Sequence, residues 1–162
     1  MGTGSESHDR WEHWLVHLLW AVSVRTSGLG EAALADSPVT LAGLGMLENI
    51  SARPGITIAE ITRRAPQTQQ ALSQIAARLE RLGLIERRLS ETGRGIGLHL
   101  TAGGLRVRAA AHERVEAFEG DLARALGGSR HRRLVKLLEE AQVIVGELDP
   151  ERRSPPVTRA AP

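Results

Sequence analysis

Hydrophobic residues return at helical spacing near both ends of this chain. Over residues 11 to about 25 an apolar side chain recurs every three or four positions, which predicts an amphipathic helix. Val16 and Trp20 lie outside that stripe, so we expect this helix to contact a partner as well as its own core. A second series, in a helix expected over residues 129–148, alternates three- and four-residue steps, which is the spacing of a seam between packed helices.

Three shorter segments follow the first helix. A link that contains Gly and Ser is expected over residues 27–38, and a second helix over residues 40–50. After a turn at residues 53–55, Thr57 and Glu60 have the spacing of a capping box, in which each side chain bonds the backbone amide of the other. This pattern predicts a short helix that ends near residue 64.

The next helix has two unlike sides. Thr68 is a suitable N-cap for it, and Gly83 is a suitable residue to end it. The side expected to be buried carries Leu72, Ile75, Ala76, Leu79 and Leu82. The opposite side is polar, with no carboxylate over residues 67–78, and presents Gln69, Gln70, Ser73, Gln74 and Arg78. Two helices joined by a short turn, the second polar outside, predict a helix-turn-helix.

Two short runs with alternating apolar residues, 84–90 and 96–100, predict a β-hairpin. Residues 91–95, Glu-Thr-Gly-Arg-Gly, form its glycine-flanked tip. Thr101 is placed to cap a long helix over residues 102–126, which two glycines close. A helix-turn-helix followed by a β-hairpin is a winged helix, so the expected fold class is mainly α with a small β-hairpin.

The composition fits one globular domain with an aliphatic core. A chain of 162 residues with 41% hydrophobic and 25% charged residues can bury one core. Aromatic residues make up only 2%, so the core must consist of Leu, Ile, Val and Ala, which suits packed helices. The absence of cysteine excludes disulfides, a thiol sensor and cysteine-ligated metal sites.

Charge is distributed unevenly along the chain. Residues 53–108 contain ten Arg and four Glu, a net charge of +6, while the whole chain carries +2 and the remainder therefore −4. Such a concentration of positive charge indicates a polyanionic partner, although an Arg-rich solvated surface would have the same composition.

The apolar run at residues 15–24 does not have the features of a targeting segment. Acidic residues precede it, His17 interrupts it, and it is too short to span a membrane. We expect it to be a buried helix in a cytoplasmic protein without membrane contact.

Two stretches resemble the MarR (multiple-antibiotic-resistance regulator) family of winged-helix transcription regulators. Residues 79–87, Leu-Glu-Arg-Leu-Gly-Leu-Ile-Glu-Arg, are similar to the family's LE..GLIER join between recognition helix and wing. Residues 94–104 resemble its wing strand, in which an Arg is followed six residues later by LT..G. The chain departs from the family pattern at Thr92, where members usually carry Asp; Glu91 stands one residue earlier.

The resemblance implies a homodimer of single domains, each spanning residues 11–148. In each, residues 11–37 and 102–148 would form the dimerisation helices and link, and residues 38–101 the winged helix-turn-helix lobe. The polar ends, residues 1–10 and 149–162, are expected to be disordered.

Such a dimer binds a pseudo-palindromic operator in double-stranded DNA, usually as a repressor. A small, often aromatic and anionic effector releases it by entering the crevice between dimerisation helices and DNA-binding lobe. Candidates for lining that crevice are Trp14, His17 and Met46.

The polar side of the second helix of the helix-turn-helix carries the predicted base contacts. Glutamine can bridge adenine through paired hydrogen bonds, and Ser is a common phosphate or base contact. Arg94 at the wing tip suits a narrow, strongly negative minor groove. The residues expected to neutralise phosphates, unless they are plain surface, are Arg63, Arg64, Arg87 and Arg88. The simpler alternative is a solvated surface. The predicted DNA-binding residues are Thr68, Gln69, Gln70, Ser73, Gln74, Arg78, Arg94, Arg63, Arg64 and Arg88.

Other kinds of site have weaker support. His13 with His17, and His112 with Glu116, have the i, i+4 spacing of a metal chelate but lack a clear third ligand, so no metal is expected. The chain has no nucleophile elbow, P-loop or dinucleotide-binding glycine pattern, so neither a cofactor nor an enzyme is expected. A winged-helix module that binds protein instead of DNA stays open, and a small enzyme is the least favoured class.

Overall fold

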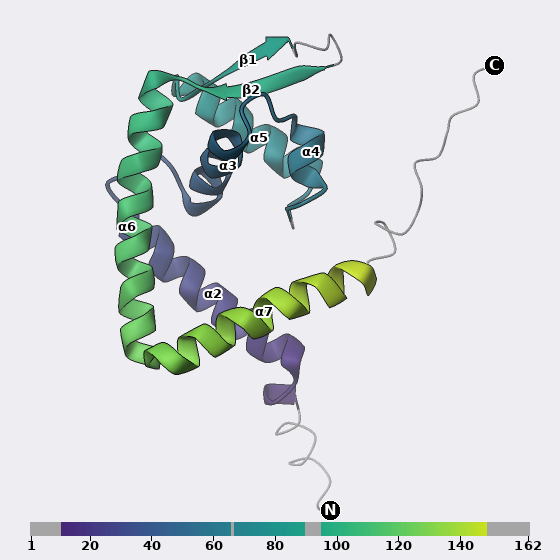
Figure 1. Cartoon of the computed structure of the whole chain (residues 1–162), viewed down its shortest axis with the longest axis vertical. Coiled ribbons are helices and arrows are strands. Elements are labelled where there is room, and N and C mark those ends of the chain that lie inside the picture. The colour runs from purple at the N-terminus through teal and green to yellow at the C-terminus, as the bar shows by residue number, and fades with distance from the viewer. Residues whose placement is uncertain (1–10, 66, 90–94, 149–162) are drawn as a thin grey trace, which may run out of the picture. The chain divides into compact units, whose positions relative to one another are not determined.

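The computed structural model describes residues 11–65, 67–89 and 95–148. Its described elements follow the order α2 (Leu15–Ala33), α3 (Leu41–Ala52), α4 (Ile58–Thr62), α5 (Gln69–Arg81), β1 (Ile85–Leu89), β2 (Ile96–Leu100), α6 (Ala102–Leu126) and α7 (Gly128–Leu148) (Figure 1). Helices joined to a two-stranded antiparallel hairpin confirm the predicted fold class. The predictions for residues 1–10, 149–162 and the wing tip at 91–94, with Arg94, lie outside the described residues.

The chain divides into two compact units, Met1–Phe118 and Glu119–Pro162, which meet within α6. The core lies in the first unit, where α3, α4 and α5 pack with the hairpin. Its most deeply buried large side chains are aliphatic residues and one methionine, as the composition requires: Met46, Leu47, Ile50, Ile56, Ile61, Leu79 and Leu98. The predicted domain limits stay a prediction.

Threonine caps begin α3, α4 and α5. Thr40 accepts a hydrogen bond from the Gly43 amide at 3.1 Å, and Thr68 accepts one from the Ala71 amide at 3.2 Å. Thr57 and Glu60 form the predicted capping box around the start of α4. Each such cap contributes about 1 kcal/mol, which matters for helices as short as α4.

Gly83 ends α5 and turns the chain into β1. Its φ of +67° lies in the left-handed region that favours glycine. The Gly83 amide donates to the Glu80 carbonyl at 2.9 Å, and the Leu84 amide donates to the Leu79 carbonyl at 3.0 Å. These two bonds form a Schellman motif, with Leu79 and Leu84 both buried, so the predicted C-terminal glycine is confirmed.

A third strand segment joins the hairpin, and the sequence pattern did not predict it. Strands β1 and β2 pair from Ile85 with Leu100 to Leu89 with Ile96. Ile56 adds a bridge to Leu98, because the Leu98 amide donates to the Ile56 carbonyl at 3.0 Å. Ile56 stands alone beside a Pro-Gly turn, so the sequence around it has no alternating pattern of a strand. Only its contact with Leu98 in the folded chain shows that it extends the sheet.

The link predicted at residues 27–38 is wrong over its first half, because α2 continues to Ala33. Gly30, which suggested a break, is buried where α3 approaches: a Cβ at this position would lie 2.6 Å from Leu41 Cδ1. Glu31 accepts a hydrogen bond from the Leu41 amide at 3.1 Å, which further links the two helices. Glycine here permits close packing within a helix and does not end it.

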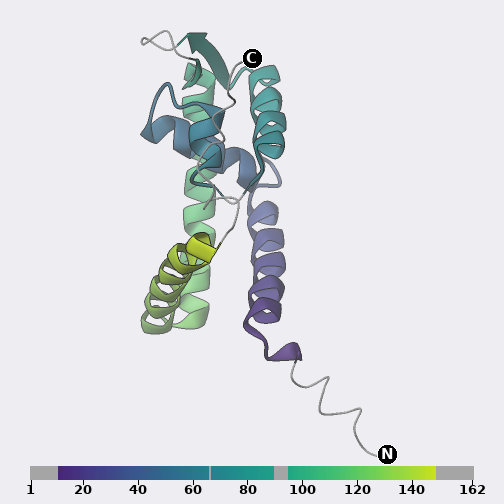
Figure 2. The same cartoon turned by 90° about the vertical axis from the view of Figure 1, so that its right-hand side faces the viewer.

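Two helices expose long apolar faces. The first turns of α2 lie beyond the lobe formed by α3, α4 and α5 (Figure 2), and Trp14, Leu15 and Trp20 are more than half exposed. In the second unit, α7 has no buried residue among its 21. Its exposed apolar side chains include most of the predicted seam, Leu134, Leu137, Leu138, Ile144, Val145 and Leu148, and also Val135 and Val143, which lie outside the seam.

Candidate nucleic-acid interface

The outer face of α5 is polar and exposed. Leu72, Ala76 and Leu79 are buried and define the inner side of this helix. At about 100° per residue, Gln70 and Gln74 lie almost opposite them. Of the predicted residues on this segment, those that are exposed are Thr68, Gln69, Gln70, Gln74 and Arg78.

Ser73 differs from the rest of the predicted set. It is half-buried, and its hydroxyl donates to the Gln69 carbonyl at 2.8 Å. Ser73 and Gln69 therefore lie on one flank of α5, nearer the core than Gln70 and Gln74. Their position suits a contact with the DNA backbone more than with a base edge.

Arg81 belongs to the outer face and was missed from the sequence. It is exposed and follows Gln70, Gln74 and Ala77 at steps of four, three and four residues. The helical period alone would have placed it there. The sequence prediction stopped at Arg78, on the flank of the helix, where that side chain lines a small hollow with Gln74 and Thr40.

Arginines around this face fall into two groups. Arg63 and Arg64, at the end of α4, are exposed, as are Arg78 and Arg81, and none of the four has an ion-pair partner among the described residues. In contrast, Arg87 donates to Glu80 at 3.0 Å, and Arg88 contacts Glu86. The first group is therefore available to an outside anion, while Arg87 and Arg88 already have carboxylate partners.

The capping box at the start of α4 keeps the Glu60 carboxyl ionised. The Thr57 amide donates to Glu60 Oε2 at 2.9 Å, and the Thr57 hydroxyl does the same at 2.9 Å. These bonds, with the nearby charges of Arg53 and Arg63, lower the pKa of the Glu60 carboxyl below its ordinary value of 4.5. Glu60 therefore remains ionised and holds the first turn of α4 in place.

The residues predicted to line an effector crevice are not brought together. Met46 is buried and lines a hollow of about 510 Å³ among α2, α3, α4 and α5. Trp14 and His17 do not line it, since they lie about 20 and about 15 Å along the helix axis from Ser27, its nearest lining residue on α2. The His17 ring instead lies 5.4 Å from Trp11 and 5.9 Å from Trp20, centroid to centroid.

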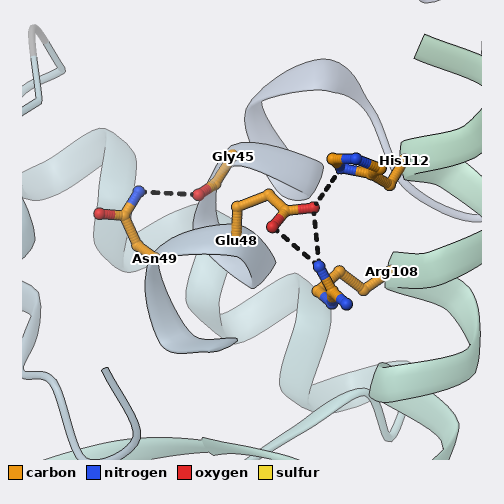
Figure 3. A network of polar contacts seen from close by, with 5 residues as sticks. All are labelled: Gly45, Glu48, Asn49, Arg108 and His112. Atoms are coloured by element: carbon orange, nitrogen blue, oxygen red, sulfur yellow. Dashed lines mark hydrogen bonds and ion pairs between the residues drawn. The ribbon is translucent and has the colours of Figure 1, made fainter. Parts of the chain in front are cut away.

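His112, whose spacing from Glu116 was noted but for which no metal was expected, contacts a residue of another helix. His112 Nδ1 lies 3.0 Å from Glu48 Oε1 on α3, and Arg108 Nη1 donates to the same carboxylate at 2.9 and 3.1 Å (Figure 3). His112 thus takes part in a polar contact between α3 and α6. Within the described part of the chain, no group of three or more His, Asp or Glu side chains could hold a metal ion.

Several known proteins are similar to this chain in sequence and in structure. A family model described as MarR family matches residues 37–94. The HTH-type transcriptional repressor Rv2887 of Mycobacterium tuberculosis is 30% identical over 127 residues, which cover 78% of this chain and 91% of that protein. A crystal structure of the same M. tuberculosis MarR family protein in complex with p-aminosalicylic acid has a TM-score of 0.65 at 29% identity, covering 80% of this chain and 98% of that one.

A more distant structure shares the fold. The S. aureus MepR–DNA complex gives a TM-score of 0.72 at 19% identity and covers 83% of this chain and 98% of that one.

None of the helices in the described residues is long and apolar enough to cross a membrane. The match to Rv2887 over nine-tenths of that protein's length, together with the winged-helix lobe, shows that this chain belongs to the MarR family of transcriptional regulators.

Proposed function

We propose that this protein is a DNA-binding repressor that acts as a homodimer and is released from its operator by a small-molecule effector. The outer face of α5 is the observation that carries the proposal. It presents Gln70 and Gln74 with no carboxylate between them, and Arg81 extends the same line. Glutamine and arginine are the side chains that bridge adenine and guanine edges in the major groove.

Positive charge around α5 supports binding to the phosphate backbone of DNA. Arg63, Arg64 and Arg78 are exposed and have no carboxylate partner among the described residues. Each can therefore pair with a DNA phosphate without first breaking an ion pair. A dimer presents two copies of this set, which would make the affinity for DNA fall steeply with salt. Arg94, on the wing, is assigned to the minor groove beside the recognition helix.

Exposed apolar surface supports the dimer. The first turns of α2 and the face of α7 that carries Leu137, Ile144 and Val145 leave large hydrophobic side chains uncovered in the single chain. Soluble monomers rarely expose contiguous apolar patches of this kind, and a two-fold pair is the commonest way to bury one. Trp14 and His17 are assigned to this interface.

A small effector is supported by the hollow that Met46 lines and by the aromatic acid bound to Rv2887 in its crystal structure. The hollow adjoins both α5 and the end of α4, so a molecule bound there is next to the proposed DNA contacts. DNA and the effector would then bind to the same lobe of the protein.

Fluorescence anisotropy with a labelled duplex tests the DNA-binding step. The duplex is the region upstream of the protein's own gene, and a scrambled duplex of equal length is measured at the same salt. We expect the upstream region to bind at least about 1000-fold more tightly than the scrambled one. Equal affinity for the two duplexes would contradict sequence-specific binding, and no binding to either would favour a protein-binding module.

A further inference from the structure

Helix α5 carries a single carboxylate, and that carboxylate forms an ion pair with the hairpin. Glu80 is the one acidic residue among the 13 of α5. Its Oε2 accepts a hydrogen bond from Nε of Arg87 on β1 at 3.0 Å. The pair spans the turn at Gly83 and joins α5 to β1. Glu80 is 42% exposed and Arg87 is 33% exposed, so a solute can reach both side chains.

Glu80 lies on the flank of α5 that we assign to the DNA backbone. At about 100° per residue, Glu80 is within about 20° of both Gln69 and Ser73 around the helix axis. On this flank an unpaired carboxylate would repel a phosphate, and an unpaired guanidinium would attract one. The ion pair cancels the two effects, so it presents no net charge to a DNA strand that passes along the flank.

Arg87 therefore differs from the arginines that have no carboxylate partner among the described residues. Arg63 is such a residue, and it can bind a phosphate and release counterions from DNA without losing an ion pair. A phosphate that approaches Arg87 also meets the Glu80 carboxylate, which lies within hydrogen-bond distance of the same guanidinium. Because two anions repel each other, the gain at Arg87 is offset.

We propose that Glu80 competes with DNA for Arg87 and thereby restrains the affinity of this protein for DNA of any sequence. In the free chain the carboxylate occupies the guanidinium as a phosphate would in a complex. Affinity that is independent of sequence arises almost entirely from phosphate contacts, so masking one arginine in each subunit lowers it. The inference rests on the proposed DNA binding and assigns to α5 a residue that limits it.

Two other roles of Glu80 lead to different results. If the pair only braced α5 against β1, neutralising Glu80 would loosen the hairpin and weaken DNA binding. If Glu80 only repelled DNA through its charge, neutralising it would strengthen binding whether or not Arg87 is present. Competition for Arg87 alone predicts stronger binding that depends on Arg87.

Fluorescence anisotropy on the full chain, with a labelled scrambled duplex at about 50 to 200 mM salt, tests the competition. Glu80→Gln is isosteric at a partly exposed position, so the fold should be retained. The variant should bind more tightly than the wild type at the low salt and steepen the slope of log affinity against log salt by about 0.9 per subunit. With two subunits on the duplex, its affinity should fall roughly 10-fold more than that of the wild type over this range. Unchanged or weaker binding would overturn the proposal.

A cycle with Arg87→Gln locates the effect. Glu80→Gln should strengthen binding at least about 3-fold more when Arg87 is present than in the Arg87→Gln background. Equal effects in the two backgrounds would show general repulsion and contradict the competition. Arg63→Gln is the matched control, because Arg63 forms no ion pair with Glu80, and its effect should simply add to that of Glu80→Gln.

The same titrations with the region upstream of the protein's own gene separate this inference from the proposed function. Equal wild-type affinities for the upstream and scrambled duplexes would refute sequence-specific binding, while a gain in Glu80→Gln that depends on Arg87 would still support the inference. Sequence-specific binding without that gain would refute the inference alone. A chain that binds neither duplex, as wild type or as Glu80→Gln, would refute both.

Discussion

Arg108 on α6 donates from a single nitrogen, Nη1, to both oxygens of Glu48 on α3, at 2.9 and 3.1 Å. Both side chains are about one-third exposed or less, 26% and 35%. The contact therefore joins the lobe to the long helix where water screens charge only partly, and we expect it to stabilise the first unit.

A double-mutant cycle with Glu48→Gln and Arg108→Gln measures this contact. Each single substitution should destabilise the protein by about 1–2 kcal/mol, because a partly buried charged group loses its partner. The double substitution should cost about 1 kcal/mol less than the two single effects together. Urea unfolding gives the three values, and strict additivity would show that the contact is energetically neutral.

The capping box makes stability depend on pH through Glu60. Its pKa is lower in the folded chain than its ordinary value of 4.5, so its ionised form stabilises the fold at all pH values above the unfolded pKa. This contribution is lost as the pH falls through the lower folded pKa. The difference in unfolding free energy between wild type and Glu60→Gln should thus be constant from pH 7 to about 5 and shrink below that. A difference that grows on acidification would contradict the assignment.

Gly104 permits the start of α6 to approach the turn that follows α5. A Cβ at Gly104 would lie 1.9 Å from the Leu84 carbonyl oxygen, so Gly104→Ala should destabilise the lobe by at least about 2 kcal/mol. Gly103→Ala is the matched control, since its Cβ would meet nothing closer than 3.5 Å and helix propensity favours Ala. Thermal unfolding should show a clear drop for the first variant and none for the second.

Sequence discrimination should depend on Gln70 and Gln74. Replacing either by Ala should lower operator affinity by about 1–3 kcal/mol and leave the affinity for a scrambled duplex nearly unchanged. Arg63→Gln provides the contrast, because Arg63 belongs to the arginines proposed to contact phosphate: it should weaken both duplexes and reduce the slope of log affinity against log salt by about 0.9 per subunit. Wild-type affinities in both glutamine variants would exclude α5 as the reading helix.

Dimerisation should depend on the apolar face of α7. Ile144 is 59% exposed in the single chain, and Ile144→Glu would place a charge in the proposed interface. Gln142→Glu adds the same charge to an exposed polar position of the same helix. Light scattering should find Ile144→Glu monomeric at micromolar concentration and Gln142→Glu dimeric, and a dimeric Ile144→Glu would remove α7 from the interface.

The sequence by itself determined the elements whose signals are local. Thr57 with Glu60, Thr68 and Gly83 act through bonds to backbone groups no more than a few residues away, so their spacing alone predicted the ends of α4 and α5. The apolar period likewise separated the buried side of α5 from its polar side. These local signals, joined in order, were sufficient for the winged helix.

Only the tertiary structure decided the features that depend on residues distant in sequence. Gly30 was predicted to lie in a link but lies within α2, where the missing side chain leaves room for Leu41. Glu48, which meets Arg108 sixty residues later, and Arg64, which borders the same hollow as Glu31, carry no local signal of those neighbours. A charged side chain has the same pattern in the sequence whether it faces water or a partner, and the packing of the helices determines which of the two it meets.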